Sequence, residues 1–117
     1  AQAEGIKIKG EHLETMQDRT FFIIKEPEYL EEPGYDNPEE TVRRLVIRVR
    51  LADGVELDYN PNQTSINMMV AQYGFEMSKW VGHKFKWDIV KQNAFGKMQT
   101  IMYVSAEKFN DLAPKEL

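Results

Sequence analysis

An alternation of apolar and polar positions between residues 41 and 51 is the clearest pattern in the chain. Leu45, Ile47, Val49 and Leu51 fall on one face of an extended segment, and the positions between them are mostly arginine. A period of two is typical of a β-strand that buries one face and exposes the other. We therefore predict a strand over residues 41–51 with one solvated face.

The turn after this strand sets the register of the next one. A two-residue Asp-Gly turn would place Leu51 opposite Glu56 and mix apolar with polar positions. A three-residue loop with Gly54 in the left-handed conformation instead places Leu51 opposite Val55, so the pattern favours the three-residue loop. The expected cross-strand pairs are then Val49 with Leu57, Arg50 with Glu56 and Arg48 with Asp58.

A helix is predicted to follow. Apolar residues recur at the spacing of one helical face: Ile66, Met69, Val70 and Tyr73. Asn62 or Thr64 is a candidate N-cap, and Gly74 ends the pattern. Trp80 extends the apolar face beyond this glycine, in a second short turn.

The last clear element is a β-hairpin made from two alternating segments, 84–92 and 98–104, which are joined by Phe95-Gly96-Lys97. In the first segment, one face carries Phe85, Trp87 and Ile89, and the other carries Lys84, Lys86 and Asp88. Nearer the N-terminus, the apolar run within residues 20–26 predicts a strand that is covered on both sides, and a short strand is expected near Ile6. Residues 105–117 form a polar tail, with a helix expected around residues 107–112.

The segment Glu26–Glu40 has a different composition. It holds seven acidic residues, three prolines and no basic residue. Because proline lacks an N–H donor and fixes φ, we predict a long acidic loop here. A loop of this length in a small domain is often functional or mobile.

The expected order is therefore strand, loop, strand, tight turn, strand, helix, strand, hairpin turn, strand. Five strands with one helix between the third and fourth is the order of an OB-fold barrel. We predict a mostly β, five-stranded OB-fold-like barrel that forms a single domain over residues 1–117. The alternative is an open α+β sheet with the helix packed on one side.

Composition limits the classes of function. The chain has 117 residues, no cysteine and two histidines that lie far apart, so the sequence predicts no disulfide and no metal site. No apolar run approaches the roughly 18 residues of a membrane span and no signal peptide is visible, so we expect a cytoplasmic protein (in the host cell if viral) without a membrane partner. We also find no Gly-rich phosphate loop, nucleophile elbow or metal-ligand cluster, which predicts a protein that is not an enzyme and has no cofactor.

Charge is distributed unevenly along the chain. The net charge is −4, but residues 1–40 carry 4 basic and 11 acidic side chains, whereas residues 79–117 carry 7 basic and 4 acidic ones. The C-terminal third is thus the basic part of an acidic protein, and this distribution leaves room for a nucleic-acid ligand.

Two sets of basic residues, with nearby aromatic residues, are candidates for binding single-stranded nucleic acid, because such sites combine a positive surface with stacking rings. The predicted contacts are Arg44, Arg48 and Arg50 on the first long strand, Lys84, Lys86 and Lys97 on the last hairpin, Phe95 at its tip, and Tyr29 and Tyr35 in the acidic loop. Each set has a plain structural alternative. Glu56 and Asp58 would neutralise the arginines, and lysines on strands oppose aggregation.

The C-terminal half of the chain resembles a known family. The motifs that carry the resemblance are Asn62-Gln63-Thr64-Ser65, Tyr73-Gly74, Trp80-Val81-Gly82-His83, Phe95-Gly96-Lys97 and Ile101. They are similar to those of small OB-fold, single-stranded-DNA-binding-like proteins of phages, prophages and archaea, over about residues 41–104. The chain departs from that pattern at His83, where lysine is usual, and in its longer acidic loop.

The resemblance and the basic residues together lead to one expectation and one alternative. We expect a non-catalytic protein that binds single-stranded DNA, or RNA in its place, in phage-type replication or recombination. The alternative is a protein-interaction module, in which the acidic loop binds a basic protein or an open strand edge pairs with a second copy of the chain.

Overall fold

The structure, a computed structural model, describes residues 6–34 and 37–109 of the chain. It is mostly β, and six strands form one antiparallel sheet. The strands are β1 (Thr20–Ile23), β2 (Glu28–Pro33), β3 (Thr41–Leu51), β4 (Glu56–Tyr59), β5 (Lys84–Ala94) and β6 (Lys97–Val104). The helical segments are α1 (Gly10–Leu13), α2 (Gln63–Tyr73) and the 3₁₀ turn η1 (Met77–Trp80).

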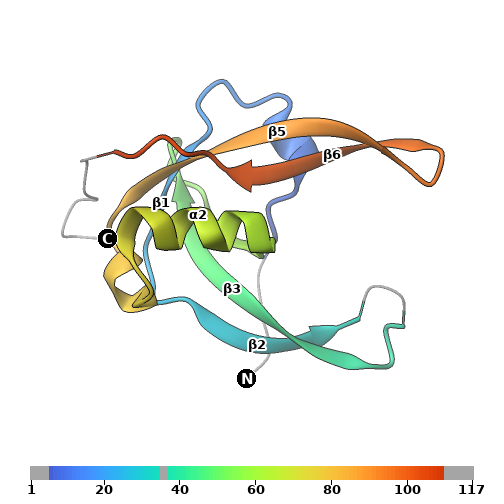
Figure 1. Ribbon diagram of the computed structural model, residues 1–117, viewed down its shortest axis with the longest axis horizontal. Coiled ribbons are helices and arrows are strands. Elements are labelled where there is room, and N and C mark those ends of the chain that lie inside the picture. The colour runs from blue at the N-terminus through green and yellow to red at the C-terminus, as the bar shows by residue number, and fades with distance from the viewer. Residues whose placement is uncertain (1–5, 35–36, 110–117) are drawn as a thin grey trace.

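β3 organises the sheet, because its two halves pair with different strands. Its first half, up to Val46, pairs with β2, and its second half pairs with both β1 and β4. β1 also pairs with β5, which forms a long hairpin with β6. The hairpins β2–β3 and β5–β6 project toward the same side of the molecule (Figure 1).

The turn between β3 and β4 has the predicted three-residue form. Gly54 has φ 92°, and the Leu51 amide donates a 2.8 Å hydrogen bond to the Val55 carbonyl. This left-handed position explains why a glycine stands there. The predicted register is confirmed, with Val49 opposite Leu57, Arg50 opposite Glu56 and Arg48 opposite Asp58.

The predicted helix is confirmed as α2. Its N-cap is Asn62, whose side chain accepts a 2.9 Å hydrogen bond from the Ser65 amide, and it ends at Gly74, with φ 87°. A cap of this kind stabilises a helix by about 1 kcal/mol. Met69 is fully buried, and the other members of the apolar stripe, Ile66, Val70 and Tyr73, pack against the core.

Aromatic side chains form the centre of the core. Phe21 stacks on Trp87 with ring centroids 3.9 Å apart, and it also meets the rings of Tyr59 and Phe85. Trp80 is likewise fully buried. Each of these side chains stabilises the fold by roughly 1.5–3 kcal/mol through burial alone. The core therefore ties β1, β4 and β5 to the segment that follows α2.

The acidic segment 26–40 is not a single loop, as the sequence predicted, because residues 28–33 form β2. Its acidic composition concealed a strand whose buried acid is neutralised by a residue from outside the segment. Glu32 is only 6% exposed, and it pairs with Lys7 and accepts a 3.1 Å hydrogen bond from Asn60. β2 is an edge strand of the sheet. A proline such as Pro33 is tolerated there because one side of an edge strand needs no N–H donor.

The closed barrel that the sequence predicted does not form, since the two strands that would close it are occupied by other segments. The outer edge of β4 exchanges two 2.9 Å hydrogen bonds with the backbone of Ile6 and Ile8. On β6, the Val104 amide donates to Ser65 of α2 and the Met102 carbonyl accepts from Asn62. The described part of the chain is therefore an open sheet with six strands rather than five, which is closer to the alternative expectation.

Two further expectations concern the ends and the helices. The helix expected around residues 107–112 is absent from residues 107–109, and its remainder lies outside the described residues. Among the helices that the structure describes, none is long and apolar enough to cross a membrane.

Candidate nucleic-acid interface

Two of the predicted arginine contacts on β3 are paired with carboxylates. Arg48 lies 3.1 Å from Asp58, and Arg50 lies 2.6 Å from Glu56. These are the neutralising pairs that the alternative interpretation expected. Arg44 donates a 3.1 Å hydrogen bond to the Pro33 carbonyl at the end of β2. The three arginines thus link β3 to β2 and β4. An exposed ion pair such as Arg50–Glu56 stabilises the fold by only about 0–1 kcal/mol.

A cluster of charges beside Arg48 has a structural role. Lys7 pairs with Glu32 of β2 and forms the backbone bridge to Asp58 of β4. Burial lowers the pKa of Lys7, while the charge of Asp58 acts in the opposite direction. Asp58 is only 5% exposed. This cluster therefore attaches the N-terminal segment to the sheet and offers little to an outside ligand.

The three predicted lysines, in contrast, share one face of the β5–β6 hairpin. Lys84 and Lys86 are two residues apart on β5, so they lie on the same face. Ala94 is an even number of residues further along that strand, and Lys97 of β6 stands opposite it, on this same face. We call Lys84, Lys86 and Lys97 the lysine face. Lys91 is out of phase and points to the other side, where it lies 2.9 Å from Glu14.

Phe22 belongs beside the lysine face, and the sequence analysis did not identify it. In the sheet register it stands opposite Arg50 on one side and opposite Lys84 on the other. The Lys84 ammonium lies 6.0 Å from the centre of its ring. Phe22 is half-buried, whereas its neighbours Phe21 and Ile23 are buried. Burial alternates along β1, so the prediction that this strand is covered on both sides is wrong, and the continuous apolar run gave no signal of this.

Residues 105–109 fold back over the inner end of the lysine face. Glu107 lies 3.6 Å from Lys86, and the ring of Phe109 lies 5.2 Å from the Lys84 ammonium. Gln72 of α2 holds this segment through a 2.9 Å hydrogen bond to the Ser105 carbonyl. The chain itself therefore supplies partners to both lysines.

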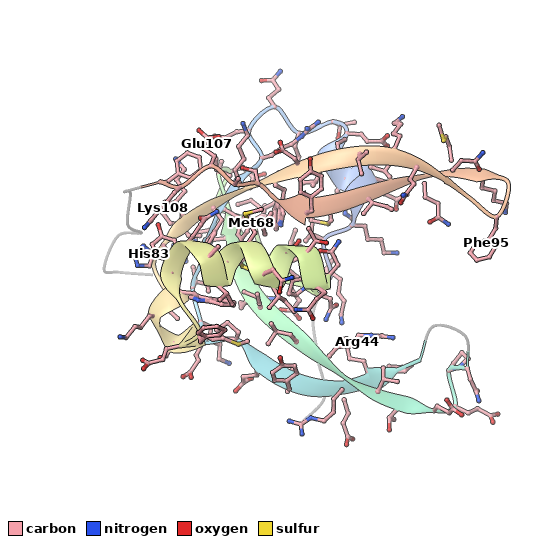
Figure 2. The ribbon with its side chains drawn as sticks, viewed as in Figure 1. Arg44, Met68, His83, Phe95, Glu107 and Lys108 are labelled. Atoms are coloured by element: carbon pink, nitrogen blue, oxygen red, sulfur yellow. The ribbon has the colours of Figure 1, made fainter. Side chains whose placement is uncertain are left out.

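His83 has a structural role close to this segment. Its ring stacks on Tyr73, with ring centroids 3.9 Å apart, and burial together with the charge of Lys108 lowers its pKa. His83, Glu107 and Lys108 gather at the end of the molecule opposite Phe95 (Figure 2). The lowered pKa favours the neutral form of the His83 ring.

Phe95 forms the tip of the β5–β6 hairpin and projects from it into solvent (Figure 2). Its φ is 53° and that of Gly96 is 76°, so both central residues of the turn are left-handed. This is the type I′ geometry, which favours Asn-Gly at these two positions. A phenylalanine here strains the backbone and gains no burial in return.

Of the two predicted tyrosines, the structure describes Tyr29, which does not join the lysine face. Tyr29 is about half exposed on β2, opposite Leu45, and the guanidinium carbon of Arg43 lies 5.8 Å from its ring. In this register it points away from the side that carries Arg44. Tyr35 lies outside the described residues.

Two other features bear on ligands. A groove of about 640 Å³ lies between α1 and the β5–β6 hairpin, and its lining mixes both charges: Lys9, Gly10, Glu11, Glu14, Lys91, Met98, Gln99 and Thr100. Within residues 6–34 and 37–109, no three metal-ligating side chains converge on one point.

Comparison of the chain with protein-family models, with curated proteins and with solved structures found no match.

Proposed function

We propose that this protein binds single-stranded nucleic acid, with DNA as the first candidate, and that it does so without catalysis. The observation that carries the proposal is the lysine face together with Phe22. It combines cations with an aromatic ring on one side of the sheet, which is the combination that single-strand binding uses.

The arrangement of strands supports an OB-like origin for this surface. β1 pairs with β3 and β5, β3 pairs with β4, and β5 pairs with β6, while α2 connects β4 to β5. These are the neighbours of an OB fold without the pair that closes the barrel. Under this proposal, the protein is an opened variant of the small phage-type proteins that its C-terminal half resembles.

Charge favours approach of the ligand from the β5–β6 side. Residues 26–40, which include β2, carry seven acidic side chains and no basic one. Phosphates would be repelled there and attracted to the lysines. Of the predicted contacts, the lysine face and Phe95 are therefore preferred over Arg48 and Arg50. The carboxylates of Asp58 and Glu56 lie 3.1 and 2.6 Å from these arginines, closer than Glu107 lies to Lys86, at 3.6 Å.

A titration of labelled oligo-dT against the full chain, at about 50 and about 200 mM salt, tests the proposal. Binding should weaken as salt rises, because cations are released from the phosphates. Lys86→Gln should weaken binding and lower the salt slope by about 0.7. Lys79→Gln is a matched control, because Lys79 also pairs with a glutamate at 3.6 Å but lies on η1. Absence of binding at low salt, or equal losses in both variants, would contradict the proposal.

A second candidate function rests on the edge strand β2. It pairs with β3 and ends the strand order of the described sheet, so its outer edge is open to a partner strand or to a second copy of the chain. Light scattering at increasing protein concentration tests this function. A stable monomer that also binds no oligonucleotide would leave a separate basic protein as the partner of β2.

A further inference from the structure

The tip of the β5–β6 hairpin presents an aromatic ring that the fold does not use. Phe95 is fully exposed, and Met98 beside it is 70% exposed. Both central residues of the turn have positive φ, which disfavours a side chain as large as phenylalanine. Neither packing nor turn geometry explains the ring, and strained residues that persist in a fold are common at ligand sites.

The surroundings of the ring suit a nucleic acid. Residues 89–104 contain two lysines and no acidic residue, in a protein whose net charge is −4. Lys97 directly follows the turn, whereas Lys91 is held by Glu14 on the other side of the hairpin. The tip therefore offers one open ring and one adjacent cation.

This pair stands apart from the rest of the lysine face. Ala94, the partner of Lys97, lies eight residues beyond Lys86, which is about 27 Å along an extended strand. Asp88 interrupts the interval, and Val90 and Ile101 face each other further along it. Tyr103 stands opposite Asp88, but a strand of bases that stack continuously would need further rings across the interval. The tip is better suited to a single stacking contact at the end of a duplex.

The neighbouring hairpin restricts where a duplex can lie. Glu39 and Glu40 are exposed on the connection between β2 and β3. Because β2–β3 and β5–β6 project to the same side, these acids would repel a duplex placed between the hairpins (Figure 1). The end of a duplex can meet the tip of β5–β6 without approaching them.

We propose that Phe95 stacks on the last base pair of a duplex at the point where it opens into a single strand. The preferred ligand is then a junction between duplex and single strand. This inference rests on the proposed function, since the single strand would run from the junction along the lysine face to Lys86 and Lys84. One aromatic–base contact gives about a tenfold gain in affinity.

The test compares three DNA probes on the full chain by fluorescence anisotropy: a single strand, a blunt duplex, and a duplex that carries the same single strand as an overhang. 2-Aminopurine at the last base pair of the junction reports stacking directly. The variants are Phe95→Ala and Phe95→Tyr, which keeps a ring. Phe75→Ala is the control, because Phe75 is 87% exposed in the segment between α2 and η1, away from the hairpin tips (Figure 1).

The junction should bind about tenfold more tightly than either other probe. Phe95→Ala should remove this preference and the 2-aminopurine signal, and Phe95→Tyr and Phe75→Ala should retain both. Equal affinity for single strand and junction, or an equal loss on both probes in Phe95→Ala, would overturn the inference and leave single-strand binding intact. Binding to no DNA would end both proposals.

Discussion

The carboxylate of Glu107 lies 3.6 Å from the ammonium of Lys86, so the segment after β6 already neutralises part of the lysine face. Both side chains are about half exposed, and such a pair contributes only about 0–1 kcal/mol. A phosphate can therefore displace the carboxylate at small cost.

Glu107→Gln should raise the affinity for oligo-dT, by up to about fivefold, because the ligand no longer competes with the carboxylate. Anisotropy at low salt measures the change. Glu76→Gln removes the other glutamate that pairs with a lysine at 3.6 Å, and it should have no effect. Equal changes in the two variants would show that only net charge matters.

Phe95→Asn should stabilise the protein, because asparagine adopts the left-handed conformation of this turn more easily than phenylalanine. We expect the free energy of unfolding to rise by about 1 kcal/mol and Tm to rise by roughly 4 °C, as measured by urea and thermal unfolding. Phe95→Ala retains a side chain unsuited to this φ and should leave stability nearly unchanged. Both variants should weaken binding to the junction, so stability and binding would move in opposite directions in Phe95→Asn. A fall in Tm in either variant would show that the ring stabilises the fold.

Lys7→Met should destabilise the fold by about 2 kcal/mol, because it leaves the buried carboxylates of Glu32 and Asp58 with fewer partners. Urea unfolding measures the loss. The double variant Lys7→Met, Glu32→Leu should recover part of it, since replacing both members of a buried pair costs less than removing one. A double variant less stable than Lys7→Met would assign Glu32 a role beyond this pair.

Tyr59 should make stability fall in alkaline solution. Burial raises its pKa to about 12, against an ordinary value of 10. Below pH 10 the phenol is protonated in both states, and between about pH 10 and 12 the unfolded chain releases the proton first. The associated stability, about 2–3 kcal/mol, is thus present below pH 10 and is lost as pH rises through 12.

Urea unfolding at about pH 9 and about pH 11 measures this loss, and Tyr59→Phe should reduce the difference between the two conditions. Tyr73→Phe is the comparison, because burial also raises the pKa of Tyr73, but that side chain is only half-buried. The same pH dependence in Tyr59→Phe and in the parent would show that other groups control alkaline unfolding.

Local patterns predicted the parts of the fold that depend on neighbouring residues. The bounds of β3 and its register with β4 follow from the alternation of residues 41–51 and from the left-handed Gly54. The same register predicted that Arg48 and Arg50 would lie opposite Asp58 and Glu56. The common face of Lys84 and Lys86 follows from the same period of two, because a strand turns its side chains alternately whatever surrounds it.

Contacts between distant segments decided the remainder. β2 is a strand because Lys7 and Asn60 satisfy Glu32, which no pattern within residues 26–40 could reveal. The sheet stays open because Ile6 and Ile8 occupy the edge of β4, while Asn62 and Ser65 occupy that of β6. Backbone donors and acceptors at a strand edge accept whichever partner the whole fold brings to them. Periodicity therefore determined β3, β4 and the β5–β6 hairpin, whereas only the packed chain determined that β2 is a strand and where the sheet ends.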